Sequence, residues 1–179
     1  KKRLLGNTYK FETLGKSREL KYLESDNSSE LLSLVNRKIK YKVNAYINLA
    51  YSDFSELVYR HYPRDSQLAL IEEIVKDVAI NYGKQKALWK HHLDNGDIHR
   101  AELLARFYPL NPEKLRAHHE EYQLKQRQEF FDNVESNPLT QDQRLGVLRS
   151  NDRNMVLAAA GTGKTSVMVA KSLDIIERG

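Results

Sequence analysis

Apolar residues recur at spacings of three and four through most of the chain, which is the period of an amphipathic helix. The first run of this kind starts after Asn27, and Asn27 with Glu30 has the pattern of a capping box. Its apolar positions are Val35, Ile39, Val43, Tyr46, Ala50, Phe54 and Leu57. Pro63 ends the run, because proline cannot donate to the helical ladder and disfavours helix in the residue before it. We therefore predict one long helix that ends at residues 61–63.

A second run with the same period starts near Asp65 or Ser66 and stops at Asn95 and Gly96. Its regularly spaced positions are Leu68, Ile71, Ile74, Val75, Val78, Tyr82, Leu88 and His92. A short turn separates the two long helices, so the pattern predicts an antiparallel helical hairpin.

Two further helices are expected after this hairpin. Asp97 has the position of a cap for a short helix that ends before Pro109. The tripeptide Asn-Pro-Glu at 111–113 combines a cap residue, proline at the first helical position and an acid near the positive helix end. The helix that starts there is expected to run to Ser136, so residues 27–136 are predicted to form a helical accessory region.

The first residues of the chain have a different pattern. Residues 8–14 alternate between polar and apolar side chains with period two, which predicts a short strand. The sequence shows no partner for this strand, so residues 1–26 are interpreted as the end of an upstream domain or as a linker with an edge strand. Because the chain begins with Lys1, we expect that residue to be an internal position of a longer protein.

The last thirty residues carry the clearest candidate chemistry. An apolar run at 155–158 predicts a strand, and residues 164–177 have the pattern of a helix. The small-residue loop that joins them, with the lysine and threonine that follow it, reads Ala158, Ala159, Ala160, Gly161, Thr162, Gly163, Lys164 and Thr165. A strand, such a loop and a helix in this order are what a phosphate-binding P-loop requires.

Each residue type in this loop has a physical role. Gly161 and Gly163 lack a Cβ, so the backbone can curl with its N–H groups inward and form an anion cradle with the positive end of the helix. Lys164 adds a charge for the β- and γ-phosphates, and the Thr165 hydroxyl is placed to bind Mg²⁺. The general motif begins with glycine, where this chain has Ala158. The alternative is a glycine-rich turn that binds nothing.

Composition narrows the class of protein. The chain contains no cysteine, which excludes disulfides and cysteine-based zinc sites and fits a cytoplasmic protein. It shows no apolar stretch of membrane-spanning length and no signal peptide, so no membrane partner is expected. The net charge of +5 is compatible with nucleic acid binding but does not require it.

The positive charge is concentrated near the N-terminus. Residues 1–42 contain eleven Lys or Arg against five Asp or Glu, and the densest cluster is Arg37, Lys38, Lys40 and Lys42. A solvated helix face is the simpler interpretation of this cluster, and contact with a phosphate backbone is the alternative. The sequence leaves both open.

The paired histidines and the tyrosines are weaker candidates. His91 and His92, like His118 and His119, are neighbours on predicted helices and therefore point in different directions. No carboxylate or cysteine pattern completes a metal site around them. We interpret them as surface or interhelical histidines, and the ten tyrosines as packing residues rather than platforms for bases.

A glutamine stands upstream of the glycine-rich loop. Leu139 and Thr140 precede Gln143, which lies about twenty residues before Lys164. This arrangement resembles the Q motif of superfamily 1 DNA helicases of the UvrD/Rep type. By that resemblance Gln143 would recognise the adenine edge, since its amide has one donor and one acceptor side. Thr140 and Gln143 also have the spacing of a capping box, which needs no ligand.

The loop itself supports the same resemblance. The family's first motif commonly reads Ala-x-Ala-Gly-x-Gly-Lys-Thr, which is similar to this chain at Ala158, Ala160, Gly161, Gly163, Lys164 and Thr165. The departure is Ala159, where relatives usually have glycine. Residues 130–139 and 165–171 also look like the helicase IV subfamily of bacterial enzymes, so the resemblance covers about residues 128–179.

The resemblance implies an ATP-dependent motor that moves along single-stranded DNA with 3′ to 5′ polarity and separates the duplex. ATP and Mg²⁺ would be its cofactors, and single-stranded or partly duplex DNA its partner. Lys164 and Thr165 would be catalytic, and Thr165 would also hold Mg²⁺ through its hydroxyl. The residues expected to bind the nucleotide are Gln143, Ala158, Ala159, Ala160, Gly161, Thr162, Gly163, Lys164, Thr165 and Ser166.

The predicted fold class is mainly α. We expect a long helical hairpin and further helices, followed in residues 137–179 by the truncated start of a P-loop α/β motor domain with one strand, the P-loop and one helix. The hydrolytic acids, arginine fingers and DNA-contacting motifs would lie downstream, so this chain alone is expected to be inactive. The alternative function is that of a related ATPase factor associated with RNA polymerase.

Overall fold

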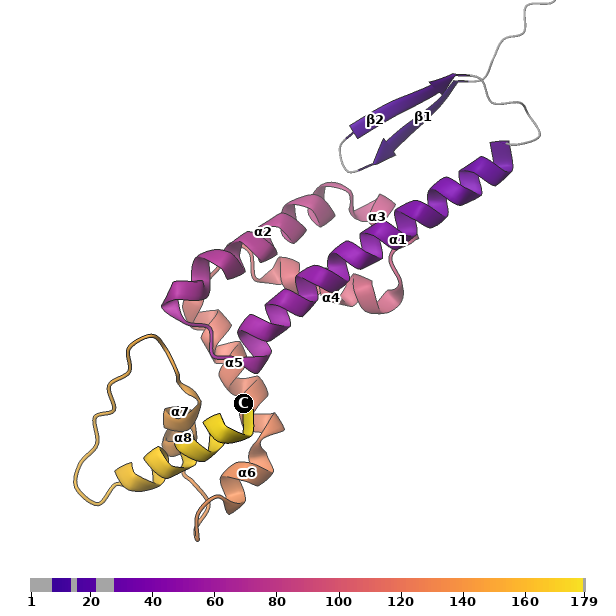
Figure 1. Ribbon diagram of the computed structural model, residues 1–179. Coiled ribbons are helices and arrows are strands. Elements are labelled where there is room, and N and C mark those ends of the chain that lie inside the picture. The colour runs from indigo at the N-terminus through magenta and orange to yellow at the C-terminus, as the bar shows by residue number, and fades with distance from the viewer. Residues whose placement is uncertain (1–7, 14–15, 22–27, 179) are drawn as a thin grey trace, which may run out of the picture. The chain divides into compact units, whose positions relative to one another are not determined.

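The computed structural model describes residues 8–13, 16–21 and 28–178, and most of these residues are helical, as predicted (Figure 1). The strands and α-helices are β1 (Thr8–Thr13), β2 (Lys16–Lys21), α1 (Ser28–Ser55), α2 (Leu68–Lys84), α3 (Lys86–His92), α4 (Asn95–Arg106), α5 (Pro112–Gln126), α6 (Gln128–Asn133), α7 (Gln141–Leu148) and α8 (Lys164–Arg178). The chain forms two compact units. Unit 1 comprises Lys1–Tyr51 and Asp77–Arg106, and unit 2 comprises Ser52–Lys76 and Phe107–Gly179.

Strands β1 and β2 form an antiparallel hairpin in which Thr8 pairs with Lys21 and Thr13 with Lys16. The predicted strand is therefore confirmed over 8–13, and the interpretation that it lacks a partner is wrong. β2 contains one apolar residue, Leu20, so it does not show the alternation by which a strand is recognised. On one edge, β1 therefore pairs with the next segment of the chain.

Unit 1 has its own apolar core. Trp89 is buried and meets the rings of Tyr46 and Tyr82 edge-on, with ring centroids 5.7 and 6.0 Å away. Tyr46 Oη donates to Asp77 Oδ2 at 2.5 Å and so ties α1 to α2, which is the contact expected of a helical hairpin. The buried apolar residues of this unit include Val43, Ile47, Val78, Tyr82, Trp89, Leu93, Ala101 and Leu104.

The second predicted helix is divided in the structure. α2 ends at Lys84, Gln85 leaves helical geometry with φ −129° and ψ 26°, and α3 ends at His92 rather than at Asn95. The Gln85 side chain accepts a hydrogen bond from Trp89 Nε1 at 3.2 Å. The apolar period continues across the break because both helices bury the same face, so the pattern could not reveal it.

Asp97 does not cap α4, contrary to the prediction. Its backbone nitrogen donates to Asp94 O at 2.9 Å and already lies within the first turn. The buried carboxylate instead accepts from Asn48 Nδ2 at 3.0 Å and pairs with Arg100 Nη1 at 2.7 Å. Asp97 therefore joins α4 to α1, a role that depends on a residue far away in the sequence.

α1 ends before Pro63, as predicted, but it does so through a π-helical turn at Glu56–Arg60. In such a turn the hydrogen bond spans five residues, here from His61 N to Glu56 O at 3.2 Å. Two side chains of α5 contact backbone carbonyls of this turn. His119 Nδ1 lies 2.6 Å from Val58 O, and the Gln123 amide donates to Tyr59 O. The end of α1 is thus fixed by α5.

α5 begins as predicted, since Asn111 Oδ1 accepts a backbone N–H of the first turn at 2.9 Å. The predicted continuation to residue 136 is wrong: the helix breaks at Arg127, and α6 ends at Asn133. The Arg127 guanidinium reaches α8, with Nε 2.8 Å from Asp174 Oδ1 and Nη2 2.6 Å from Glu177 Oε2. These long-range ion pairs are invisible in the local sequence.

Unit 2 has a second core, in which α7 and α8 pack against the α6 segment. Its buried residues are Phe131, Leu139, Val147, Leu148, Val167 and Ala170, with Leu124, Phe130 and Val134 partly buried against them. The helix predicted from Lys164 is confirmed as α8. This packing sets α7 beside the start of α8.

The strand predicted at 155–158 is wrong. These residues are irregular, and the side chains of Met155 and Leu157 are 81% and 84% exposed. A strand needs a neighbour for its backbone groups, and no described segment pairs with this one. Within the described part of the chain, no helix has the length and apolar content to cross a membrane.

Candidate nucleotide-binding site

The glycine loop, residues 158–163, joins the irregular segment to α8. Gly161 and Gly163 have φ angles of 75° and 83°, which lie in the left-handed region that glycine adopts without strain. A Cβ at Gly163 would also clash with the amide nitrogen of Gln143. The left-handed backbone therefore requires glycine at 163, and a Cβ there would displace the Gln143 amide.

The loop leads directly into the N-terminus of a helix of 15 residues. Val167 N donates to Gly163 O at 3.1 Å and closes the first turn, whose preceding N–H groups have no intrahelical carbonyl to bind. Thr165, exposed, and Ser166, partly buried, lie in this turn. These free N–H groups can donate to phosphate oxygens, and the positive end of the helix attracts negative charge. The residues present therefore fit the triphosphate of a nucleotide.

Lys164 is folded back onto the loop. Its Nζ donates to Ala158 O at 3.0 Å and to Ala159 O at 2.6 Å. Thr162 Oγ1 also donates to Ala159 O, at 2.8 Å. The loop carbonyls thus hold the ammonium group beside the helix N-terminus, and Lys164 must exchange them for phosphate oxygens if a nucleotide binds.

Gln143 contacts both the start of its own helix and the glycine loop. Its Oε1 accepts from Thr140 N at 2.8 Å and its backbone N donates to Thr140 Oγ1 at 3.4 Å, so the predicted capping box of α7 is confirmed. Its Nε2 donates to Thr162 O at 3.2 Å. The cap therefore also presents the amide to the loop, and recognition of an adenine edge would require Gln143 to release one of these partners.

Lys171 joins α8 to the end of α7, a role that sequence reasoning missed. Its Nζ donates to three carbonyls, those of Gly146 (3.4 Å), Val147 (2.9 Å) and Arg149 (2.6 Å). Burial, together with the charge of Arg178, lowers the pKa of this ammonium group. The signal in the sequence is its spacing: Lys171 lies four residues after Val167 and therefore on the buried face of α8. A partly buried ammonium group needs acceptors such as carbonyl oxygens.

A second missed feature is the buried Asp174 on the same face of α8. Its carboxylate pairs with Arg178 one helical turn later and with Arg127 at the break between α5 and α6. A buried carboxylate is retained only where cations compensate its charge. Asp174 therefore holds α8 against the rest of unit 2 and is a structural residue.

The other sequence candidates have partners of their own. His118 Nε2 lies 2.9 Å from Tyr59 Oη and the buried His119 has Nδ1 2.6 Å from Val58 O, so both pack α5 against the π-helical turn, as interhelical histidines. No group of three His, Cys, Asp or Glu residues in the described part of the chain could hold a metal ion. The basic cluster is exposed on α1, and its Lys40 pairs with Asp94 at 2.7 Å.

Comparison with known proteins singles out the same region. Residues 139–179 match the model of the UvrD/REP helicase N-terminal domain family. A stretch of 59 residues is 42% identical to DNA helicase IV of Escherichia coli (strain K12), and it covers 33% of this chain and 9% of that protein. No solved structure matches the chain significantly. The part of the chain that carries Gln143 and the glycine loop is thus similar to part of the UvrD/REP helicase N-terminal domain and to a short stretch of DNA helicase IV.

Proposed function

We propose that the full-length protein is an ATP-dependent DNA helicase and that this chain supplies the phosphate-binding part of its nucleotide site. The observation that carries the proposal is the contact between Gln143 and the glycine loop at the N-terminus of α8. This arrangement lies inside the segment that matches the helicase family model. A loop that only connected the preceding segment to α8 would need neither two left-handed glycines nor a lysine at the start of the helix.

The residues have distinct roles in the proposed site. The N–H groups of the glycine loop and of the first turn of α8 bind the phosphates, and Lys164 neutralises their charge. Gln143 binds the adenine base through its amide. Mg²⁺, held by the Thr165 hydroxyl, would neutralise charge on the transferred phosphoryl group.

Translocation requires more than this chain contains. We propose that the acids that complete the Mg²⁺ site, the arginine fingers and the DNA-binding motifs lie elsewhere in the full-length protein. Movement with 3′ to 5′ polarity on single-stranded DNA rests on the resemblance to UvrD/Rep-type helicases. Purified residues 1–179 should therefore not hydrolyse ATP, and measurable turnover by this chain would contradict the proposed division.

The main test is Lys164→Ala in the full-length protein. ATP turnover should fall at least about a hundredfold, because charge compensation at the transferred phosphate is lost. Lys125→Ala is a matched control, since the Lys125 side chain is exposed on α5 and makes no hydrogen bond or ion pair with any described residue. Unchanged ATPase activity in Lys164→Ala would refute the proposal.

DNA dependence tests the substrate separately. The wild-type ATPase should be strongly stimulated by single-stranded DNA, as expected of a motor that moves along it. ATPase activity that does not change when single-stranded DNA is added, together with co-purification with RNA polymerase, would instead support the polymerase-associated alternative.

A further inference from the structure

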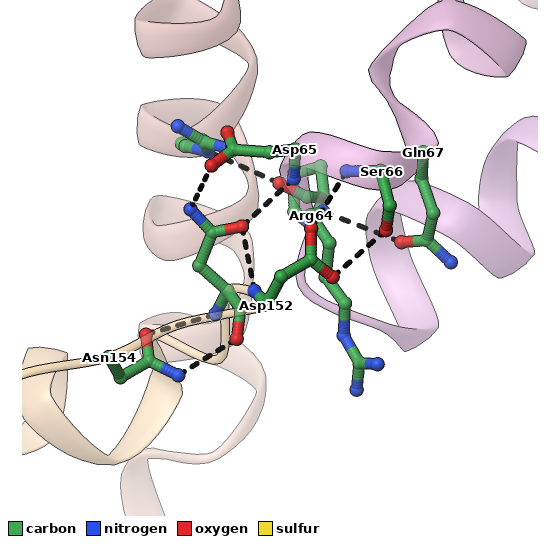
Figure 2. Close-up of polar contacts among 9 residues, drawn as sticks. Arg64, Asp65, Ser66, Gln67, Asp152 and Asn154 are labelled. Carbon is green, nitrogen blue, oxygen red and sulfur yellow. Dashed lines mark hydrogen bonds and ion pairs between the residues drawn. The ribbon is translucent and has the colours of Figure 1, made fainter.

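Asn151 and Asp152 lie in the loop that leads from α7 to the glycine loop. Their side chains accept hydrogen bonds from the turn between α1 and α2, 86 residues earlier in the sequence (Figure 2). Asp65 N donates to Asn151 Oδ1 and Asn151 Nδ2 donates back to Asp65 Oδ2, both at 2.8 Å. Ser66 donates twice to Asp152, from its backbone N at 2.8 Å and from its hydroxyl at 2.9 Å. We call these four residues the junction.

The junction supplies a helix cap from a distant part of the chain. The 3₁₀ turn at Asp65–Gln67 starts the helical segment that continues as α2. Arg64 precedes this turn and has no side-chain acceptor with which to cap it. The oxygens of Asn151 and Asp152 bind the free N–H groups instead, and the carboxylate of Asp152 suits the positive helix end.

The turn that receives the loop is itself held in place. Arg116 on α5 donates to Pro63 O at 3.1 Å and to Asp65 Oδ1 at 2.5 Å. The Arg116 and Asn151 hydrogen bonds hold the pKa of the Asp65 carboxyl below its usual range. The junction is thus anchored on the helical part of unit 2.

The loop is also ordered within itself up to the residue before the irregular segment. Asn154 Oδ1 accepts from Asn151 N at 3.0 Å, and Asn154 Nδ2 donates to Asn151 O at 2.9 Å. Residues 155–157 are exposed, and the hydrogen bonds of the glycine loop begin at Ala158. The junction therefore fixes the chain up to Asn154, with residues 155–157 between it and the glycine loop, while Gln143 and α8 contact the end of the loop.

We propose that Asn151 and Asp152 are positioning residues for nucleotide binding, because they hold the entry of the glycine loop against the turn between α1 and α2. The inference rests on the proposed function. It makes this turn part of the scaffold of the nucleotide site. Since α1 ends and α2 begins there, it is also where the helical region is bonded to the segment that binds ATP.

The test uses the full-length protein with the double substitution Asn151→Ala and Asp152→Ala. The KM for ATP and the dissociation constant of a fluorescent ATP analogue should both rise about tenfold, equivalent to about 1.4 kcal/mol. The kcat at saturating ATP should stay within about twofold, because Lys164 and Thr165 are untouched. Amide hydrogen exchange at Asp65 and Ser66 should become faster, since the side chains that accept from these two N–H groups have been removed.

Two single variants separate positioning from general folding. Ser66→Ala, on the helical side of the junction, removes one of four hydrogen bonds and should raise the KM about twofold to threefold. Its effect should vanish in the background of Asp152→Ala, because both remove the same hydrogen bond. Asp152→Asn keeps an acceptor for Ser66 and should stay closer to wild type than Asp152→Ala.

Arg153→Ala is the control within the same loop, since Arg153 is exposed and makes no hydrogen bond or ion pair with any described residue. A merely structural role would lower the melting temperature and the fraction of active enzyme but leave the KM unchanged. An unchanged KM in the folded double variant would overturn the proposal, and if that variant does not fold, an unchanged KM in Ser66→Ala would do so. Wild-type protein that binds no ATP would refute the proposed function instead.

Discussion

Unit 1 and the segment around the glycine loop differ in how they bury their apolar side chains. In unit 1, Trp89, Ile47 and Leu104 are almost completely buried among helices of the same unit. In the C-terminal segment, Met155, Leu157 and Ile176 are between 74% and 84% exposed. Unit 1 also has exposed apolar side chains on α1, Tyr41 and Leu49, but it encloses a core. Among the described residues no such core surrounds residues 155–157.

The largest expected effect tests this difference directly. Trp89→Ala should lower the free energy of unfolding of unit 1 by about 3–5 kcal/mol, because it leaves a large cavity in a closed core. Leu157→Ala should change stability by no more than about 0.5 kcal/mol in this chain. Urea denaturation followed by circular dichroism measures both. Equal losses would show that the segment before the glycine loop is packed after all.

The second prediction compares two glycines. Gly163→Ala in the full-length protein should weaken ATP binding at least about tenfold, because the left-handed backbone is strained by about 1–3 kcal/mol and the methyl group clashes with Gln143. Gly83→Ala is the control, since its Cβ would meet no described atom within 4 Å on α2. It should stabilise unit 1 by about 0.5–1 kcal/mol. Titration with a fluorescent ATP analogue and thermal melting distinguish the two outcomes.

Acid should destabilise both units, and unit 2 more strongly. Burial lowers the pKa of His119 and of His92 from the usual 6.5, so each binds a proton more readily in the unfolded state. Their stabilising contribution is complete above pH 6.5 and is lost as the pH falls toward the folded-state value. His119 should contribute more, because it is fully buried and its Nε2 has no partner among the described residues.

The measurement is urea denaturation at about pH 7.5 and about pH 5.5. His119→Gln should remove most of the pH dependence in this window, and the matched change at the exposed His99 on α4 should leave it intact. A pH dependence that is unaltered in His119→Gln would assign the effect to other groups.

The smallest effect concerns the basic cluster on α1. The double substitution Arg37→Glu and Lys38→Glu should change stability by less than about 0.5 kcal/mol, because both side chains are exposed. If the cluster binds a phosphate backbone, affinity for single-stranded DNA will fall. The slope of log affinity against log salt concentration will become shallower by about 0.7 for each phosphate that the variant no longer binds. An unaltered salt dependence in the full-length protein would identify a solvated helix face.

Local signals in the sequence were sufficient wherever the interacting groups are close in the chain. Pro63 marked the end of α1, Asn111 the start of α5, and Thr140 with Gln143 the cap of α7, because each acts on backbone groups within a few residues. The same signals failed at Gln85 and Arg127, where helices break. Gln85 bonds Trp89 and Arg127 pairs with Asp174, and neither contact interrupts the regular spacing of apolar residues from which the helices were predicted.

The candidate site shows the same division. Gly161, Gly163 and Lys164 were recognisable by type and spacing, and the position of Gln143 relative to them came from the family resemblance. Spacing placed Lys171 on the buried face of α8, but neither its carbonyl partners at the end of α7 nor the pairing of Asp152 with Ser66 had a signal in the sequence. Their partners lie between 22 and 86 residues away, and nothing in a local pattern identifies which distant group a lysine or an acid will bind.

The sequence by itself determined that the chain is mainly helical, where several helices begin and end, and which residues form the glycine loop, because propensity, capping and glycine torsion angles act within a few residues. The tertiary structure decided that 155–158 is not a strand here, since a strand exists only with a partner. It also decided that the loop before the glycine loop caps the helical segment leading into α2. Strand pairing and capping by a distant loop both need two segments that are far apart in the sequence to lie side by side. Only the packing of the folded chain determines which segments do so.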